Sequence, residues 1–140
     1  MPHAALSAAP ADLDRKASDL FDRIAIIDLI THIGLSLDEK RFDNLRSIFT
    51  ADVVVKRGHS QGRLASTHHL FTDYLIELSG DKAEVRANLR GFHVHRAEAP
   101  ASHFDIAERY RFEMVRTAEG WRVFRMTTEP VWTAGDAPAG

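Results

Sequence analysis

Apolar and polar residues alternate along the chain from Ala83 to His95, and this is the clearest pattern in the sequence. The odd positions are small or apolar until the last two, which are histidines, whereas the even positions begin Glu84, Arg86, Asn88 and Arg90. Side chains alternate sides along a strand, so this split predicts a strand with one packed face and one solvated face. Both His93 and His95 fall on the packed face. Two titratable rings in that position are the best indication of a functional site.

The other periodic segments predict helices first and strands afterwards. Helical spacing of apolar residues predicts a helix over residues 19–38 and a short second helix over residues 42–49. Strands are expected at 51–56, 67–78, 82–96, 103–116 and 121–131. The turns Ser79–Asp81 and Ala118–Gly120 favour hairpins. This order predicts an α+β fold, in which N-terminal helices pack on a strongly curved antiparallel sheet that forms a cone-shaped half-barrel with a pocket.

Length and composition indicate one domain. The chain has 140 residues, of which 44% are hydrophobic and 27% are charged, and its formal net charge is -2. One soluble domain is expected over residues 18–133. Residues 1–17 and 134–140 are rich in small residues, Pro and Gly, so we expect them to be flexible tails.

The same counts exclude several classes of partner. Charges of both signs are interspersed, so there is no basic patch for nucleic acid or an anionic membrane. The chain has no cysteine, which leaves no disulfide or thiolate metal site and fits a reducing compartment. No apolar stretch approaches the roughly 20 residues that span a bilayer, and the N-terminal segment does not have the pattern of a signal peptide. We therefore expect a cytoplasmic protein with no membrane partner.

Two acids are predicted to point toward the packed interior. Glu108 falls among the apolar and aromatic even positions of the fourth expected strand, which include Tyr110 and Phe112. Burying a lone carboxylate is costly, so Glu108 must be protonated or paired, for example with Arg125. Asp38 lies five full helical turns after Leu20 and so projects toward the same side as the apolar arc, or simply ends the helix.

The histidine pair at 68 and 69 is ambiguous in the pattern. His68 shares its parity with Leu70, Tyr74 and Ile76, which slightly favours His68 as the inward residue. A β-bulge in this strand would reverse the choice and turn His69 inward.

Several stretches together resemble SnoaL-like proteins of the nuclear-transport-factor-2-like superfamily, nearest in motif to scytalone dehydratase and lindane dehydrochlorinase. The similar stretches lie between about Leu20 and Asp136 and are 23–30, 37–45, 48–54, 67–69, 120–123 and 132–136. The resemblance implies the fold strongly and the reaction weakly, because one fold hosts many chemistries.

The resemblance also implies roles for individual residues. Asp38 matches an acidic dyad member and His69 the histidine that it orients, so the resemblance favours His69 over His68. His95 matches a second pocket histidine, and Glu108 and Tyr110 match polar pocket positions.

Two features depart from the family pattern. Leu37 and Arg57 stand where the dehydratase has tyrosines that hold a catalytic water. The stretch from Gly58 to Ser66 lacks the third helix expected before the histidine strand, which leaves the pocket mouth open or covered by a neighbouring subunit.

These residue types suit proton transfer without a cofactor. An imidazole has an ordinary pKa of about 6.5, so neutral His69 can act as a base that Asp38 orients, with His95 as a second acid–base group. We expect a lyase or isomerase acting on a small apolar cyclic or polyketide-like molecule, or alternatively a binding module with the same pocket. The expected substrate contacts are Glu108, Tyr110, His93, Phe71, Phe112 and Met126.

Metal binding and assembly complete the expectations. His93 and His95, with His69 or Glu108, form a possible zinc or iron set, but no metal and no cofactor are expected. A homo-oligomer, either a dimer or a trimer, is expected through an apolar sheet face for which the candidates are Phe92, Val94, Phe124 and Met126.

Overall fold

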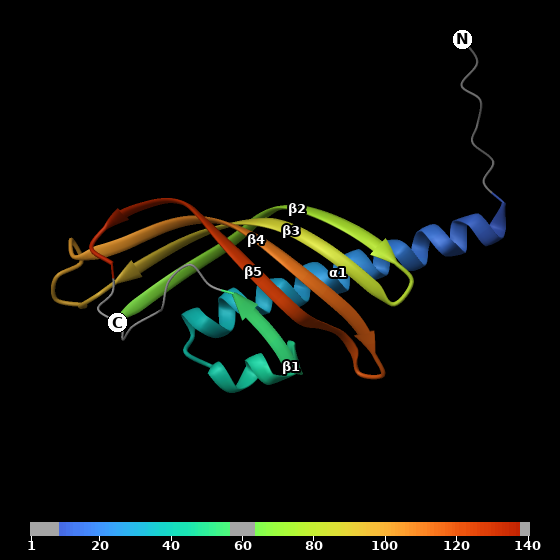
Figure 1. The fold of residues 1–140 in the computed structure, drawn as a ribbon, viewed down its shortest axis with the longest axis horizontal. Helices are drawn as coiled ribbons and strands as arrows, with labels where there is room; N and C mark the ends of the chain where they lie inside the picture. Colours follow the sequence, from blue (N-terminus) through green and yellow to red (C-terminus); the bar gives the residue numbers. More distant parts are fainter. Residues whose placement is uncertain (1–8, 57–63, 138–140) are drawn as a thin grey trace, which may run out of the picture.

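A computed structural model describes residues 9–56 and 64–137 of the chain. One long helix crosses one face of a curved, open, five-stranded sheet (Figure 1). The elements are α1 (Pro10–Asp38), the 3-10 helix η1 (Phe42–Ser47), β1 (Phe49–Lys56), β2 (Ser66–Ser79), β3 (Lys82–Val94), β4 (His103–Thr117) and β5 (Gly120–Gly135). The α+β architecture predicted from the sequence is confirmed.

The sheet has the order β1-β5-β4-β3-β2. Strands β2 to β5 form an antiparallel meander, and both predicted hairpin turns join neighbouring strands. Gly80 and Gly120 have φ angles of 59° and 108°, a region that favours glycine, and this explains their place in the tight turns. Strand β1 adds a parallel edge beside β5, which the sequence pattern did not predict.

Helix α1 begins earlier than the apolar pattern predicted. It starts at Pro10, whose fixed φ suits the first helical turn, and Asp12 forms ion pairs with Arg15 and Lys16 one turn later. Part of the expected N-terminal tail is therefore helical. At the other end of the chain, β5 continues to Gly135, two residues into the expected C-terminal tail.

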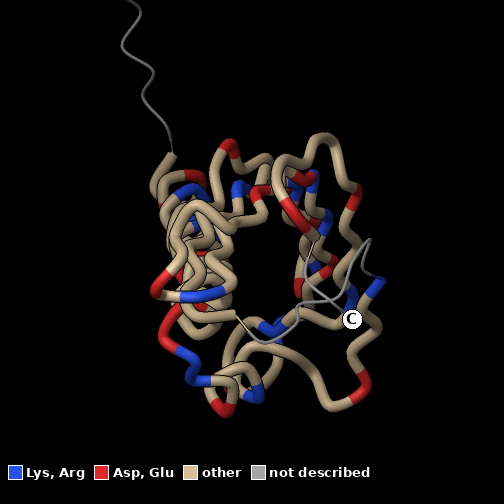
Figure 2. Tube along the Cα trace, turned by 90° about the vertical axis from the view of Figure 1, so that its left-hand side faces the viewer, with Lys and Arg blue, Asp and Glu red and all other residues tan. Residues whose placement is uncertain are grey.

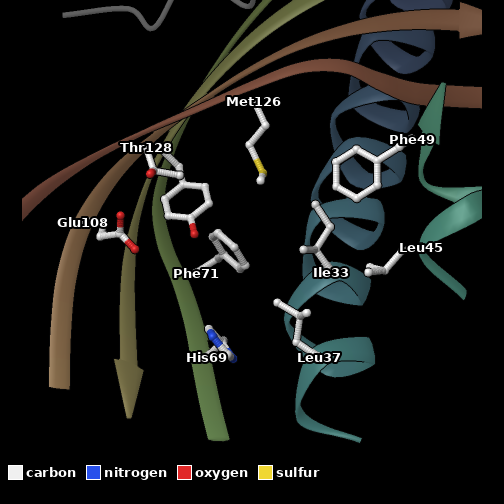
Figure 3. A pocket seen from close by; sticks show the side chains of 10 residues that line it. Ile33, Leu37, Leu45, Phe49, His69, Phe71, Glu108, Met126 and Thr128 are labelled. Atoms are coloured by element: carbon white, nitrogen blue, oxygen red, sulfur yellow. The ribbon is translucent and has the colours of Figure 1, made fainter. Parts of the chain in front are cut away.

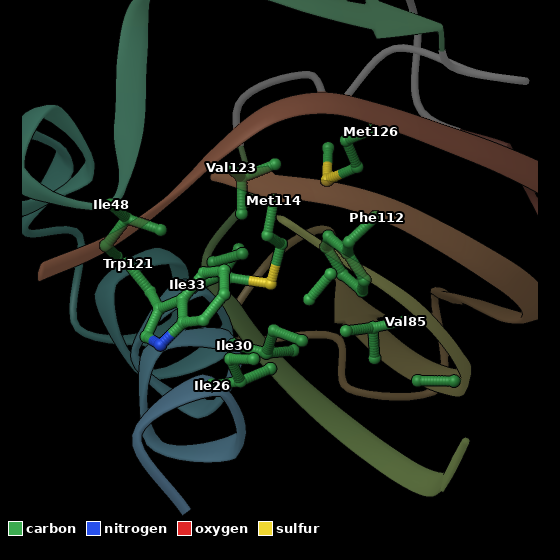
Figure 4. Packing of buried hydrophobic residues seen from close by; sticks show 12 residues of the cluster. Ile26, Ile30, Ile33, Ile48, Val85, Phe112, Met114, Trp121, Val123 and Met126 are labelled. Atoms are coloured by element: carbon green, nitrogen blue, oxygen red, sulfur yellow. The ribbon is translucent and has the colours of Figure 1, made fainter. Parts of the chain in front are cut away.

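The core lies between α1 and the inner face of the sheet (Figure 4). Ile26, Ile30 and Ile33 recur at helical spacing along the buried face of α1. From the sheet they meet Val85, Phe112, Met114, Trp121, Val123 and Met126. Full burial of each large side chain contributes about 1.5–3 kcal/mol, so this cluster fixes α1 on the sheet.

Register shifts in β2 and β5 decide which side chains face inward. In β2 the register with β3 shifts between Thr72 and Leu75, and Asp73 adopts a φ of 58°. In β5 an irregularity leaves Phe124 as an extra residue between the pairs of Val123 and Arg125. Each bulge shifts the alternation by one position. Met126 is consequently buried, not part of an exposed sheet face as the pattern predicted.

No helix in the described part of the chain is both long enough and apolar enough to span a bilayer. Residues 57–63, which include Arg57 and most of the stretch expected to lack a third helix, lie outside the described ranges. Acidic and basic positions are interspersed around the described chain (Figure 2).

Candidate functional site

Asp38 and His69 meet where the end of α1 crosses β2. The Nδ1 atom of His69 lies 2.6 Å from Oδ1 of Asp38, and the backbone N–H of His69 donates to Oδ2 at 3.0 Å. The Thr67 hydroxyl donates to Oδ1 at 2.9 Å. These contacts hold the carboxylate on both oxygens. Because a carboxylate accepts hydrogen bonds, Nδ1 of His69 carries the proton and Nε2 is the basic nitrogen of the neutral ring.

The bulge in β2 explains why His69 is the inward residue. Its side chain is 1% exposed, whereas His68 is exposed on the opposite face, with its ring 6.5 Å from the ring of Phe92. His69 and Phe71 precede the bulge, and Tyr74 and Ile76 follow it. All four side chains face α1, although the first two have odd numbers and the last two have even numbers. The uninterrupted alternation that favoured His68 was therefore wrong.

A second imidazole packs against His69. The ring of His93 lies 5.2 Å from the ring of His69, edge to face, and its Nδ1 lies 2.9 Å from the carbonyl oxygen of Phe104. His93 is 1% exposed. Gly91 lies opposite His69 in the register and provides the space for this pair, since a Cβ there would stand 2.9 Å from Cε1 of His93.

A pocket opens beside His69 between α1, η1 and the sheet (Figure 3). Its cavity volume is about 30 Å³, and the larger figure of about 480 Å³ includes space that is open to solvent. Most of its lining is apolar and comes from five elements: Ile33, Leu37, Leu45, Phe49, Phe71 and Met126. The polar lining residues are His69, Glu108, Tyr110 and Thr128. The apolar walls favour a small hydrophobic ligand, and the few polar groups can orient it.

Glu108 is the buried acid of this pocket. It is 2% exposed and lies on β4, opposite Leu89 of β3. Arg125, the partner considered from the sequence, forms an ion pair with Glu113 at 3.1 Å. Tyr110 follows two residues later on β4, and its ring packs edge to face on Phe71 at 5.1 Å.

Three predicted residues do not line this pocket. Strand β3 ends at Val94, so the alternation no longer applies at His95, whose Nε2 lies 2.6 Å from the carbonyl oxygen of Asp136. His93 packs behind His69, and Phe112 lies fully buried in the core. The structure thus brings Asp38, His69, Glu108, Tyr110, Phe71 and Met126 to one place and leaves His95 apart from them.

Sequence reasoning missed several residues of the site. Thr67 is one of them, and its hydroxyl donates to Asp38. Residues 67 and 69 lie on the same face of a strand, so the position of Thr67 two residues before His69 could have indicated this contact. Ile33, Leu45 and Phe49 had clear apolar periodicity, but nothing in the pattern distinguishes a pocket wall from a core residue. Thr128 lies between two register shifts in β5, where parity alone is not informative.

Within residues 9–56 and 64–137, no three His, Asp or Glu side chains group closely enough to hold a metal ion. The His93, His95 and His69 set considered from the sequence does not assemble, because His95 lies with Asp136 at the end of the sheet.

A long helix on a curved open sheet, with a pocket between the two, is the nuclear-transport-factor-2-like fold. The sequence profile of the SnoaL-like domain matches residues 18–66 and 55–127. The chain therefore belongs to the SnoaL-like domain family.

Individual relatives extend this result. An uncharacterised protein of Mycobacterium tuberculosis, Rv2910c, is 26% identical over 135 residues, which cover 82% of this chain and 91% of the relative. A protein from Novosphingobium aromaticivorans, provisionally named a scytalone dehydratase, has a crystal structure with a TM-score of 0.78 and 18% identity, covering 89% of this chain and 93% of that one. The crystal structure of a hexachlorocyclohexane dehydrochlorinase of type 2 has a TM-score of 0.71 and 22% identity, covering 92% of this chain and 99% of that one. The structural matches establish the fold.

Proposed function

We propose that the protein is a cofactor-independent lyase or isomerase that uses His69 and Asp38 to move a proton on a small apolar cyclic or polyketide-like substrate. The observation that carries the proposal is the 2.6 Å contact between Nδ1 of His69 and Asp38 at the wall of a largely apolar pocket. The similar folds whose names denote a dehydratase and a dehydrochlorinase support an elimination or a related proton transfer.

His69 acts as the base in this proposal. Its Nε2 removes a proton from a carbon next to a carbonyl, and the electron pair of that C–H bond moves into the carbonyl to give an enolate. Asp38 stabilises the imidazolium that forms and fixes its orientation. A positioned base of this kind contributes about 10²–10⁴-fold to a rate.

The same proton can then leave in two ways. In an isomerisation, the imidazolium returns it to a different carbon of the enolate. In a dehydration, the enolate expels a hydroxyl from the neighbouring carbon, the C=C bond forms, and the imidazolium proton completes the departing water. Both routes begin and end with neutral His69, so neither needs a group other than the side chains of the pocket.

A turnover assay tests the proposal directly. Cyclic ketones and hydroxylated aromatics are incubated with the protein, and NMR follows dehydrated or isomerised products. We expect His69→Asn to lower turnover at least about 100-fold and Asp38→Asn to lower it substantially, both with retained ligand binding. The control is His32→Asn, because His32 lies on the exposed face of α1. Equal turnover by wild type and His69→Asn would contradict the base role.

A non-catalytic binding module is the second candidate, and Leu37 favours it. Leu37 lines the pocket beside Asp38, at a position where the resemblance to scytalone dehydratase implies a tyrosine that holds a catalytic water. If the protein binds members of the panel and wild type converts none of them, while His69→Asn changes only affinity, the binding module is the correct account.

We also propose a homo-oligomer formed through the outer sheet face. Phe92 and Trp132 are 37% and 47% exposed there, and the guanidinium of Arg90 lies 5.9 Å and 5.8 Å from their ring centroids. Exposed aromatic groups beside arginine are typical of protein interfaces. Light scattering should give a multiple of the 15.7 kDa chain mass, and Phe92→Glu should reduce it. A monomer at micromolar concentration would rule this out.

A further inference from the structure

We propose that the N-terminal half of α1 pairs with the same segment of a second copy of the chain, as an antiparallel two-helix coiled coil. The pairing surface, called the seam below, lies on the side of α1 that faces away from the sheet and consists of four residues: Leu13, Ala17, Leu20 and Ile24. This contact is separate from the one proposed above through the outer sheet face, because α1 and the outer face lie on opposite sides of the sheet.

The first argument is that α1 is apolar on two opposite faces. Ile26, Ile30 and Ile33 are buried against the sheet. Ile24 precedes Ile26 by two residues, which is about 200° around a helix, so it points away from the core. The large side chains on this second face are exposed to solvent: Leu13 by 55%, Leu20 by 59%, Phe21 by 73% and Ile24 by 50%. An amphipathic helix buries its apolar face, so the second face calls for a second partner.

The second argument is the spacing of these residues, which is that of a coiled coil. Residues 13, 17, 20 and 24 follow one another at intervals of four, three and four. These intervals are those between the a and d positions of a heptad repeat. The seam covers about three helical turns, so it can contact another helix along its whole length.

The third argument is that the first turns of α1 project past the edge of the sheet (Figure 1). In the described part of the chain, no hydrogen bond or ion pair joins residues 10–21 to the sheet, and the first such contacts come from Asp22 and Arg23. Short helical segments are only marginally stable in water, and most helix stability in proteins comes from packing of an apolar face. A second helix on the seam supplies that packing.

The exposed apolar surface is large enough for a specific contact. Four large side chains that are half or more exposed leave on the order of 400 Å² of apolar surface on one helix face, and patches of this size mark interaction sites. Two copies bury about twice that area, and the polar residues around it bring the total toward the roughly 1,200 Å² at which specific interfaces begin. The area therefore fits a weak to moderate dimer.

The seam is complementary to itself in the antiparallel direction. The intervals of four, three and four read the same from either end, so a two-fold axis at the middle of the seam matches the seam residues with one another. Leu13 then lies opposite Ile24 of the partner subunit, and Ala17 lies opposite Leu20 of the partner subunit. The small side chain of Ala17 leaves room for the leucine, so both layers pack apolar groups together. This self-complementarity identifies a second copy as the partner.

The charges beside the seam are compatible with this pairing. In the antiparallel arrangement, Lys16 lies near Arg23 of the partner subunit. Lys16 forms an ion pair with Asp12 of its own helix at 3.0 Å, and the guanidinium of Arg23 donates to the carbonyl oxygen of Ile76 at 2.8 Å. Both cations therefore have partners in their own chain, which reduces the repulsion between them.

A charge-swap experiment tests the pairing. Ala17→Glu and Leu20→Lys are each made in a Phe92→Glu background, which removes the proposed contact through the outer sheet face. Sedimentation equilibrium over the micromolar range measures the mass of each variant alone and of their equimolar mixture. The matched controls are Ala25→Glu and Ser18→Lys, at exposed positions of α1 outside the seam. Circular dichroism establishes that each variant is folded, and if Phe92→Glu does not fold the series is made in wild type.

We expect the Phe92→Glu chain and both controls to dimerise, with twice the 15.7 kDa mass of one chain. Ala17→Glu or Leu20→Lys alone should weaken dimerisation at least about tenfold, because two identical variants bury unpaired charges in the seam. The mixture should dimerise more tightly than either variant alone, since the introduced carboxylate then meets the introduced ammonium group.

Three results would overturn the proposal. One is a Phe92→Glu chain that stays monomeric over the micromolar range, and another is dimerisation that neither seam substitution weakens. The third is a mixture that dimerises no better than its components, because a parallel pair sets residue 17 against residue 17 and residue 20 against residue 20. The outer sheet contact is judged separately, by the effect of Phe92→Glu on the mass of the wild-type assembly.

Discussion

Asp38 is an acid at the unfavourable end of a helix. It is the last residue of α1, where the helix dipole places partial negative charge, and a carboxylate there lowers helix stability. The three hydrogen bonds from Thr67, the His69 backbone and the His69 ring offset that cost. Such a placement is better explained by the orientation of His69 than by a need to end the helix.

The role of Thr67 can be measured with an isosteric change. Thr67→Val removes one hydrogen bond to Asp38 and leaves the shape of the side chain. We expect a loss of about 1 kcal/mol in the free energy of unfolding from urea titration, together with a drop in turnover that is smaller than that of Asp38→Asn. Thr67→Ser, which keeps the hydroxyl, is the control. Wild-type stability in Thr67→Val would mean that the hydroxyl does not support the dyad.

Gly91 is predicted to be required for the packed histidine pair. In Gly91→Ala the new methyl group would lie 2.9 Å from His93 and 3.2 Å from Ile106, so one of these groups must move. We expect a loss of about 1–3 kcal/mol in stability and shifted NMR signals from the rings of His69 and His93. The exposed ring of His32 serves as an internal control whose signals stay in place. Unshifted His69 and His93 signals would refute this account of Gly91.

At this scale, the sequence predicted the inward acids well and the histidines less well. Asp38 and Glu108 follow from helical periodicity and strand alternation, which hold over uninterrupted elements. His68, His69 and His95 lie near a bulge or a strand end, where parity no longer reports the facing side. The bulge itself is marked by Asp73 in a left-handed conformation, which acidic residues tolerate and no alternation pattern detects.

At the scale of elements, one ionic cluster ties α1 to the sheet. The guanidinium of Arg116 on β4 bonds both oxygens of Asp22 at 2.7 Å and lies 4.5 Å from the Trp121 ring centroid. Trp121 also donates from Nε1 to Asp22 at 3.1 Å, and Arg116 reaches Asp81 in the turn before β3. This cluster fixes the start of the packed part of α1 and, through it, the position of Asp38 at the far end.

The cluster makes a prediction about pH. Hydrogen bonds from Arg116 lower the pKa of Asp22 in the folded chain, against the smaller opposing effect of burial. A lowered folded pKa gives stability that is fully present above the unfolded pKa of about 3.9 and is lost as the pH falls through the folded value. Asp22→Asn should therefore be less stable than wild type by about 1 kcal/mol at pH 7, and the difference should vanish in strong acid.

Chemical denaturation between pH 7 and pH 2 measures this difference. The control is Asp14→Asn, an exposed residue of α1 for which we expect a change within about 0.5 kcal/mol. A constant gap between wild type and Asp22→Asn down to the lowest pH would contradict the proposed linkage.

The elements themselves were largely predictable, and their ends were not. Apolar periodicity located every strand of the meander because each has one packed face. The first turns of α1 carry no inward apolar stripe, so periodicity could not detect a helix that Pro10 and local ion pairs favour. The parallel pairing of β1 with β5 depends on the path of the chain around the sheet, which local patterns do not encode.

At the scale of the whole molecule, function depends on a space that no single element encloses. The pocket takes its walls from α1, η1 and four strands, so its shape follows from the curvature of the sheet and the position of α1 on it. The sequence predicted that a pocket would exist because a curved sheet covered by a helix leaves one. Of the apolar residues that line the pocket, it predicted Phe71 and Met126 but not Ile33, Leu45 or Phe49, since the core and the pocket wall share the same periodicity.

The most direct test of the central claim is the transfer of solvent deuterium to a bound ketone. Proton NMR in D₂O follows the hydrogens next to the carbonyl of each cyclic ketone that binds, with wild type, His69→Asn and His32→Asn at equal concentration. The account predicts exchange by wild type and His32→Asn, reduced at least about 100-fold in His69→Asn with unchanged affinity. Bound ketones that do not exchange with wild type, or that exchange equally fast with His69→Asn, would contradict it.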